Sequence, residues 1–304
     1  MISAGPRLRD LMRKGAVPVP GIYDALTALL VEKTGFQAAY VSGAGLSVAL
    51  HGQPDIGLLT LSEVADTVRR LARATALPMI VDADTGFGGD DNVARAVREL
   101  EGAGAAGIQI EDQVFPKRCG HLTGKGVVPA EIMVSKVRAA VSARRDPGFV
   151  IVARTDARGV TGLKDALRRA ELYRRAGADV IFPEALESED EFRAFGRRAG
   201  AGKKSLGALM ANMTEFGRSP VLSVPELARL GFRLVLFPMT AFRTAAFAVQ
   251  QSLNELKQKG HNRSLLGRMQ TRRELYELNH YQDFDRRERE YLSPSASINR
   301  RRKK

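Results

Sequence analysis

Short apolar segments alternate along this chain with longer stretches of helical periodicity. The apolar segments are rich in Val, Ile, Phe and Met and are apolar almost throughout, which is typical of strands buried on both faces of a parallel sheet. We predict eight strands, at residues 17–24, 38–43, 78–84, 107–113, 149–156, 180–186, 208–215 and 234–242.

The intervening stretches have the spacing of amphipathic helices. Residues 61–75 place Leu61, Val64, Val68 and Leu71 on one face, with Ser62 as the expected N-cap. Residues 131–144 and 162–177 repeat the pattern, and the second of these ends at a glycine, a common C-terminal signal. Eight strands that alternate with helices predict an α/β fold, a closed (β/α)8 barrel.

The chain continues beyond what eight strand–helix units require. Residues 244–260 and 264–285 also have helical character, and an extension of this kind commonly packs on another subunit, so we expect an oligomer. We expect one barrel domain at residues 1–290, which includes this extension, and a disordered basic tail at residues 291–304.

Composition places the chain among ordinary globular proteins. Of its 304 residues, 44% are hydrophobic and 27% are charged, and no apolar run is long enough to span a bilayer. One cysteine excludes an internal disulfide framework and fits a reducing compartment. We therefore expect a cytoplasmic protein that does not bind a membrane.

The formal net charge of +13 raises the possibility of nucleic-acid binding. Most Lys and Arg residues, however, are dispersed on the predicted helices beside acidic residues, and the sequence has no tryptophan. The only basic block is "INRRRKK" in the tail. We expect no nucleic-acid partner, and the positive charge then serves to attract an anionic small molecule.

The predicted strands end in ionisable and polar residues. In a (β/α)8 barrel the carboxyl ends of the strands form the active-site rim, so this concentration indicates an enzyme. The residues concerned are Asp24, Ser42, Asp82, Asp84, Glu111, Asp112, Arg154, Asp156, Glu184, Asn212, Thr214 and Arg243.

The segment "VDADTGFGG" carries two carboxylates, Asp82 and Asp84, which lie on one face if the strand continues through them. Adjacent like charges are costly without a nearby cation, and Mg2+ prefers oxygen ligands. Glu111 on the next strand is a third candidate oxygen donor. The alternative is that one carboxylate caps the next helix and the other pairs with an arginine.

The segment "KRCGH" contains the only cysteine, Cys119. The cations Lys117 and Arg118 favour an ionisable thiol, which can donate a proton in catalysis. Gly120 gives the loop freedom, and His121 is placed to tune or relay the proton. A buried structural cysteine and a nucleophilic cysteine are the alternatives.

Three arginines complete the candidate chemistry. Arg154 and Arg243 follow predicted strands, and Arg272 lies in the helical extension. Guanidinium groups bind carboxylates bidentately, so several at one mouth indicate a polyanionic substrate. A surface salt bridge remains the alternative for Arg272.

Several motifs, in this order, resemble the isocitrate lyase / phosphoenolpyruvate mutase superfamily, and "KRCGH" resembles its lyase branch. The resemblance covers residues from roughly 10 to roughly 285. The motifs are "YVSGAG", "VDADTGFGG", "EDQVFPKRCGHLTGK", "VARTDA", "IFPEAL", "LMANMTEFG" and "MQTRRELY".

The resemblance implies reversible cleavage of 2-methylisocitrate to pyruvate and succinate, a step of the methylcitrate cycle of propionate catabolism. It implies Mg2+, or Mn2+ in its place, held by Asp82 and Asp84 with Glu111 in the hydration shell. It also implies a homotetramer, a dimer of dimers in which the eighth barrel helix is exchanged between paired subunits.

By the same resemblance, Cys119 protonates the succinate carbanion, with Lys117, Arg118, His121 and Glu111 as further catalytic candidates. The substrate-binding residues that it implies are Tyr40, Ser42, Gly43, Ala44, Asp82, Cys119, Gly120, Arg154, Glu184, Asn212, Met213, Thr214, Arg243 and Arg272. The ionisable residues at the predicted strand ends, considered without the resemblance, also indicate an anionic substrate.

Several alternatives remain open from the sequence. Related lyases act on dimethylmalate or isocitrate, and an oxaloacetate decarboxylase is a further possibility within the superfamily. A basic nucleic-acid-binding protein on a barrel is the remote alternative.

Overall fold

The computed structural model describes residues 3–200 and 205–292. Within these ranges eight parallel strands, β1 to β8, pair in sequence order and close into a barrel, because β8 also pairs with β1. The strands are β1 Val17–Ile22, β2 Ala39–Val41, β3 Met79–Asp82, β4 Gly107–Glu111, β5 Val150–Thr155, β6 Val180–Pro183, β7 Ala208–Asn212 and β8 Leu234–Phe237. The predicted (β/α)8 barrel is confirmed.

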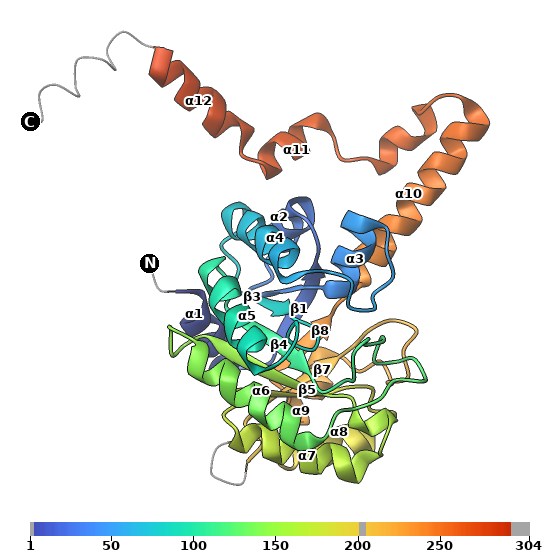
Figure 1. The fold of residues 1–304 in the computed structure, drawn as a ribbon. Helices are drawn as coiled ribbons and strands as arrows, with labels where there is room; N and C mark the ends of the chain where they lie inside the picture. The colour runs from blue at the N-terminus through green and yellow to red at the C-terminus, as the bar shows by residue number, and fades with distance from the viewer. Residues whose placement is uncertain (1–2, 201–204, 293–304) are drawn as a thin grey trace, which may run out of the picture. The chain divides into compact units, whose positions relative to one another are not determined.

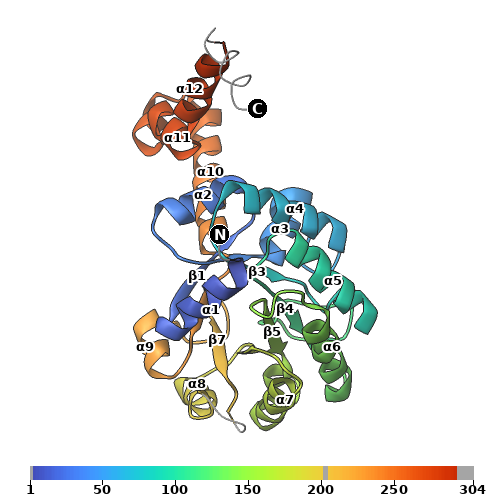
Figure 2. The ribbon, with the colours of Figure 1, turned by 90° about the vertical axis from the view of Figure 1, so that its left-hand side faces the viewer.

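Helices follow one another around the outer face of the barrel, as Figures 1 and 2 show, and α1 precedes them in the chain. The helices are α1 Ala4–Lys14, α2 Ala25–Lys33, α3 Gly43–His51, α4 Leu61–Ala74, α5 Asp90–Gly102, α6 Ala130–Ala143, α7 Leu163–Arg175, α8 Glu189–Gly196 and α9 Val224–Arg229. A short 3-10 helix, Ala157–Gly159, follows β5. None of the helices that the structure describes is long and apolar enough to cross a membrane.

Two predicted helix ends can be compared with the structure. The helix α4 begins at Leu61, and its N-cap is Thr60 rather than Ser62, because Thr60 and Glu63 form a reciprocal capping box. The helix α7 ends at Arg175, and Gly177 then adopts a φ of +110°, which suits glycine at a helix C-terminus.

The chain divides into two compact units, Met1–Ala245 and Ala246–Lys304. The helix α10 Thr240–Lys259 spans this boundary. In the second unit it is followed by a 3-10 helix Arg263–Arg268, α11 Arg272–Leu278 and α12 Tyr281–Leu292. The helical character expected at residues 264–285 is therefore divided among three short helices. Most of the expected basic tail, from residue 293, lies outside the described residues.

Side chains that point into the barrel form a cluster separate from the layer between strands and helices. Tyr40, Val152 and Phe182 belong to this interior cluster, and α1 adds Leu8 and Met12. The backbone of α1 at Gly5 lies against Gly148, just before β5, so α1 covers the amino ends of the strands. The interior is thus packed, and the opposite, carboxyl ends are left for chemistry.

We expect Leu8→Ala to lower the free energy of unfolding by about 2–5 kcal/mol, because it leaves a cavity at a fully buried site at the base of the barrel. Leu26→Ala is the control, since Leu26 is 50% exposed and its truncation should cost less than about 0.5 kcal/mol. Urea unfolding followed by circular dichroism measures both. Equal losses in the two variants would contradict a packed base.

Candidate active site

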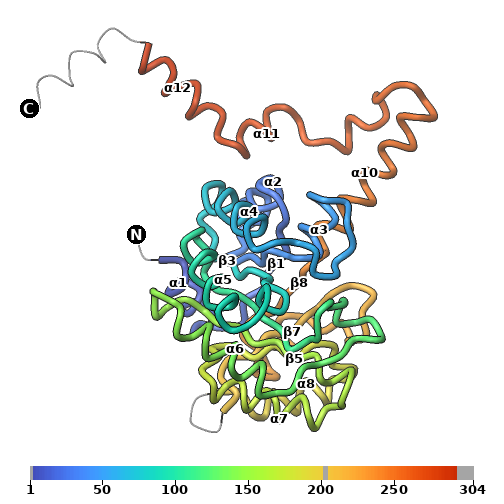
Figure 3. Tube along the Cα trace, in the orientation of Figure 1, coloured from blue at the N-terminus to red at the C-terminus, as the bar shows by residue number. Residues whose placement is uncertain are grey.

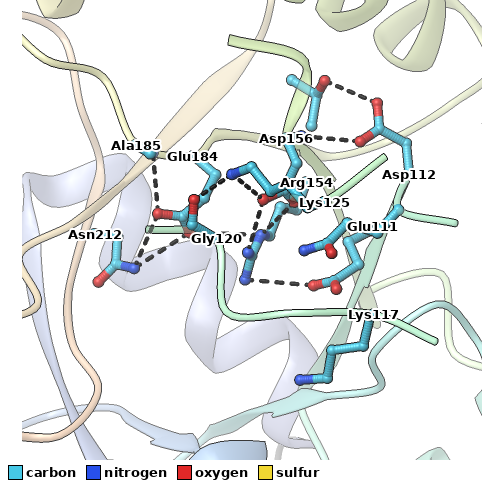
Figure 4. Close-up of polar contacts among 12 residues, drawn as sticks. Glu111, Asp112, Lys117, Gly120, Lys125, Arg154, Asp156, Glu184, Ala185 and Asn212 are labelled. Atoms are coloured by element: carbon cyan, nitrogen blue, oxygen red, sulfur yellow. Dashed lines mark hydrogen bonds and ion pairs between the residues drawn. The ribbon is translucent and has the colours of Figure 1, made fainter. Parts of the chain in front are cut away.

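The carboxyl ends of the strands and the loops that follow them form one polar centre (Figure 4). Contacts in this centre join β3, β4, β5, β6 and β7 with the long loop between β4 and α6, which is traced in green in Figure 3. We call residues 113–127 of this loop the lid.

Asp82 is the last residue of β3, and the strand does not continue to Asp84. Asp84 has a φ of +47°, a left-handed conformation, and its backbone N–H donates to Asp82 Oδ1 at 3.1 Å. The two carboxylates are therefore brought together by a turn rather than by strand alternation. Burial, followed by the neighbouring Asp82, raises the pKa of Asp84 to about 6, although Lys117 opposes this shift.

Lys117 from the lid is the cation beside this acidic turn. Its Nζ lies 2.7 Å from Asp84 Oδ1 and also pairs with Asp55, and its side chain is only 4% exposed. Burial lowers the pKa of Lys117, but Asp84, Glu111 and other carboxylates outweigh it and raise the pKa above its ordinary value. The ammonium is thus committed to carboxylates, whereas the sequence suggested that it serves the thiol.

Glu111, at the end of β4, is buried with one of its oxygens unused. Glu111 Oε2 lies 3.3 Å from Arg154 and 3.4 Å from Gln109 Nε2, while Oε1 has no hydrogen-bond partner among the described residues. Gln109 also accepts a 2.6 Å hydrogen bond from the Tyr40 hydroxyl. Burial raises the pKa of Glu111 well above its usual range.

Arg154, near the end of β5, lies among three carboxylates, as Figure 4 shows. Its guanidinium makes a bidentate contact with Asp156 at 2.9 and 3.0 Å and lies 3.4 Å from Glu184 and 3.3 Å from Glu111. Burial lowers the pKa of Arg154, but Asp156 and the other carboxylates raise it well above the ordinary value. Arg154 is therefore a fixed cation.

Glu184 follows β6 and is a fixed anion. Burial raises its pKa, but Arg154 and then His121 and Lys125 outweigh burial and lower the pKa to about 2. Asn212 Nδ2 donates to both Glu184 oxygens at 3.2 and 3.3 Å, which leaves the buried Asn212 Oδ1 without a partner among the described residues. This amide oxygen is available to accept from a ligand.

The amino end of α3 supplies backbone donors to the same centre. Ser42 is its N-cap, and the Ser42 hydroxyl accepts from Gly45 N–H at 3.2 Å. A side chain on Gly43 would lie 2.9 Å from Asp82 Oδ2, so glycine allows the helix end to approach that carboxylate. The N–H groups of residues 43 and 44 belong to a helix N-terminus, which suits a carboxylate ligand.

The lid enters the site through Gly120. A side chain at this position would collide with Arg154 Nη2 and with Glu184, so only glycine allows such an approach. Lys125 secures the lid, because its Nζ lies 3.0 Å from Asp156 Oδ1 and also bonds to the Gly120 carbonyl. The preceding residue, Cys119, is an exposed free thiol.

His121 joins the lid to the loop after β7. Its Nε2 lies 2.8 Å from Glu184 Oε1, and its Nδ1 accepts a 2.9 Å hydrogen bond from Arg218 N–H. A nitrogen that accepts carries no proton, so this arrangement requires the neutral tautomer with hydrogen on Nε2. Arg218 Nε donates in addition to the His121 carbonyl at 3.2 Å.

Other predicted residues lie at the margin of the site. Arg243 lies 3.6 Å from Glu215 and stacks over the Phe216 ring. The Arg118 side chain is exposed, although its backbone N–H donates to Gln113. The remaining ones are Met213, which is buried and accepts from Leu222 N–H, and Thr214, which is half-buried. Arg272 begins α11 in the second unit, and its binding role stays a prediction.

The residues present fit a hydrated divalent cation. Asp82, Asp84 and Glu111 are hard oxygen donors, and the unused Glu111 Oε1 can accept from a metal-bound water. Within residues 3–200 and 205–292, no three His, Cys, Asp or Glu side chains converge closely enough to enclose an ion. Water would therefore supply several ligands, as is usual for Mg2+.

Asp55, Lys125 and Arg218 were not predicted as site residues. Asp55 lies in the loop before α4 and pairs with Lys117, while Arg218 lies in the loop after β7. Lys125 ends the motif "EDQVFPKRCGHLTGK", and this motif and the two neighbouring glycines were the sequence signals that this part of the loop approaches the site. Pairings between distant loops leave no periodic pattern in a sequence.

The barrel and its rim define an enzyme whose chemistry takes place at the carboxyl ends of parallel strands. The chain belongs to the phosphoenolpyruvate phosphomutase family, whose family model matches residues 8–257. An Aeropyrum pernix protein named 2-methylisocitrate lyase is 51% identical over 284 residues, which cover 93% of this chain and 89% of the relative.

Solved structures agree with this assignment. The chain matches 2,3-dimethylmalate lyase, described as a member of the PEP mutase/isocitrate lyase superfamily, with a TM-score of 0.86 and 34% identity over 94% of both chains. It matches phosphonopyruvate hydrolase in complex with oxalate and Mg2+ with a TM-score of 0.85 and 30% identity, over 96% of this chain and 100% of the other. The predicted superfamily is confirmed.

The low pKa of Glu184 predicts an acid-dependent loss of stability. The folded-state pKa of about 2 lies below the ordinary 4.5, so this stabilisation is complete above pH 4.5 and is lost as the pH falls toward 2. We expect the difference in unfolding free energy between wild type and Glu184→Gln to shrink by about 2 kcal/mol between pH 5 and pH 3. Urea unfolding at each pH measures it.

Glu187→Gln is the matched control for this experiment, because it removes one glutamate charge at a side chain that is 36% exposed. Its stability difference from wild type should change much less over the same pH interval. If the difference in unfolding free energy between wild type and Glu184→Gln stays constant between pH 5 and pH 3, Arg154 and His121 do not stabilise the ionised carboxylate.

Proposed function

We propose that this enzyme is a Mg2+-dependent carbon–carbon lyase that cleaves 2-methylisocitrate to pyruvate and succinate, a step of the methylcitrate cycle. The observation that supports it best is the site itself, in which an acidic turn and a buried arginine face a lid that carries the only thiol. The 51% identity to a protein named 2-methylisocitrate lyase supports this substrate over related diacids.

In this proposal Asp82 and Asp84 hold the metal, and Glu111 contacts its water. When bound, Mg2+ supplies positive charge to the carboxylate and hydroxyl of the part of the substrate that becomes pyruvate. The solved complex of phosphonopyruvate hydrolase with oxalate and Mg2+ supports a divalent cation in this family. Mn2+ is the alternative ion.

The protein residues have complementary roles in this proposal. Arg154 and the N–H groups at the start of α3 orient the pyruvate half, and Tyr40 borders it from β2. Asn212, Arg243 and Arg272 bind the succinate half, together with neighbouring residues. These neighbours are Glu184, Met213 and Thr214.

The reaction breaks one carbon–carbon bond. The substrate hydroxyl gives its proton to solvent water as the pyruvate carbonyl forms, and the electron pair of the broken bond remains on the succinate carbon. The Cys119 thiol donates its proton to that carbon, and the resulting thiolate is reprotonated for the next turnover. Lys117 and His121 support this step by holding the lid at the site through their carboxylate partners, and Arg118 supports it by placing positive charge beside the thiol. The closed lid excludes water.

We also propose that the enzyme is a homotetramer in which α10 is exchanged between paired subunits. This is supported by α10, which spans the two units, and by α12 of the second unit, because neither helix buries a side chain. Apolar surface of this kind usually has a partner. The exposed apolar residues include Phe247, Val249, Leu253, Phe284, Tyr291 and Leu292.

The cytoplasmic location remains a prediction.

A panel of acids assayed by pyruvate release tests the substrate. We expect kcat/KM to be highest for 2-methylisocitrate and about 10- to 200-fold lower for isocitrate, which lacks the methyl group.

We also expect chelation to abolish turnover and added Mg2+ to restore it. Faster turnover of 2,3-dimethylmalate or oxaloacetate would overturn the assignment, and activity after complete chelation would overturn the metal role.

We expect Cys119→Ser to lower kcat by at least about 100-fold, because serine is a far weaker acid at this position, and to leave the thermal unfolding midpoint unchanged. Leu122→Ala is the control in the same lid, since Leu122 is 59% exposed. Steady-state kinetics and thermal unfolding measure both variants. Wild-type turnover in Cys119→Ser would remove the proposed proton donor.

A further inference from the structure

Asp112 is a fully buried carboxylate that follows Glu111, and its carboxyl group lies on the opposite side from that of Glu111 (Figure 4). Its Oδ1 accepts from Asp156 N–H at 2.9 Å. Its Oδ2 accepts from Thr155 Oγ1 at 2.8 Å, Tyr173 hydroxyl at 2.7 Å and Arg169 Nη1 at 3.3 Å. All four partners are donors, so the position requires a group that only accepts.

The same residue holds both ends of the lid. The lid starts directly after Asp112, and the Asp112 carbonyl accepts from Val128 N–H at 2.9 Å where the lid returns. A β-bridge joins Gln113 to Val127. Arg169 secures the returning end, because its Nη1 donates to the Val128 carbonyl at 2.8 Å.

Asp112 also holds the end of β5. Through Thr155 and the Asp156 backbone it fixes the turn whose Asp156 side chain contacts Arg154 at 2.9 and 3.0 Å. The same Asp156 carboxylate receives Lys125 from the lid at 3.0 Å. One buried carboxylate is thus linked both to the guanidinium in the site and to the loop that covers it.

We propose that Asp112 and Arg169 are positioning residues that fix the two ends of the lid and the orientation of Arg154 as one unit. The proposal rests on the proposed function only in so far as the lid and Arg154 serve the lyase reaction. Neither residue reaches the site itself, so both act through the backbone of residues 127–128 and 155–156.

The chemistry of the anchor explains why an aspartate is required. An asparagine would keep the shape, but its amide NH2 would face donors at one of the two oxygen positions. Burial raises the pKa of Asp112, and the hydrogen bonds from Asp156 N–H, Tyr173 and Thr155 oppose that shift. Arg169 is itself held by Asp165, at 2.8 Å.

Asp179 offers a matched control, because it contacts the first residues of β5 whereas Asp112 contacts the end of β5. Its Oδ2 accepts from Ile151 N–H of β5 at 2.9 Å and pairs with Arg144 at 2.7 Å, and its Oδ1 lies 2.9 Å from Arg9. Asp112→Asn and Asp179→Asn therefore both remove a carboxylate that binds an arginine and a backbone N–H, at Asp156 just after β5 in the first case and at Ile151 within β5 in the second. Only the first lies at the lid.

Hydrogen exchange of the full-length protein and steady-state kinetics test the proposal. In Asp112→Asn we expect the amides of Val114 in the lid and of Val128 directly after it to exchange at least about tenfold faster, and kcat to fall about 10- to 100-fold. In Asp179→Asn we expect the same amide exchange rates and kcat to stay within about twofold of wild type, even if its unfolding midpoint falls as much as that of Asp112→Asn. Tyr173→Phe removes one donor and should give a smaller change in the same direction.

Similar lid exchange and similar kcat in the two asparagine variants would overturn the positioning role. If Asp112→Asn does not fold, Tyr173→Phe decides: faster lid exchange supports the proposal, and wild-type exchange overturns it. If the wild type turns over none of the diacids tested, the proposed function fails, and the exchange measurements still decide whether Asp112 holds the lid.

Discussion

The excess of negative charge at the barrel mouth is the constraint on which the site depends. Three carboxylates, Glu111, Asp156 and Glu184, surround the single guanidinium of Arg154. Such crowding is tolerated in a buried site only if further cations approach. Burial is the main cause of the raised pKa of Asp84 and of Glu111; neighbouring carboxylates add to it, while Lys117 and Arg154 oppose it. An anionic substrate can enter this site only together with positive charge, which is why a divalent cation suits it.

The lid supplies positive charge to these crowded carboxylates. It brings two ammonium groups, Lys117 to the acidic turn after β3 and Lys125 to Asp156. Both side chains are almost completely buried, at 4% and 3% exposure. The loop that carries the thiol thus also carries two cations whose ion pairs hold it at the barrel mouth. Without those carboxylates the lid would bury two ammonium groups at a high desolvation cost.

The sequence predicted the barrel well because each strand is a short, continuous apolar segment between helical stretches. Its predicted strand ends extended too far, since polar residues such as Asp84 and Thr214 belong to loops. The residue types at those strand ends indicated an active site, but the sequence did not show which side chains form ion pairs or hydrogen bonds with one another there. Asp55 meets Lys117 across 62 positions and Arg218 meets His121 across 97, and only the folded barrel brings them together.

The geometry also limits how the proposed proton donor can act. Lys117 and Lys125 tie the lid to the barrel on either side of Cys119, and the ends of the lid are fixed at Asp112. Gly120 is buried against Arg154 while the adjacent Cys119 is exposed. Delivery of a proton to a substrate carbon therefore requires a reorientation confined to the few residues between the two lysines. A glycine directly after the thiol makes such a local rotation possible without releasing either ion pair.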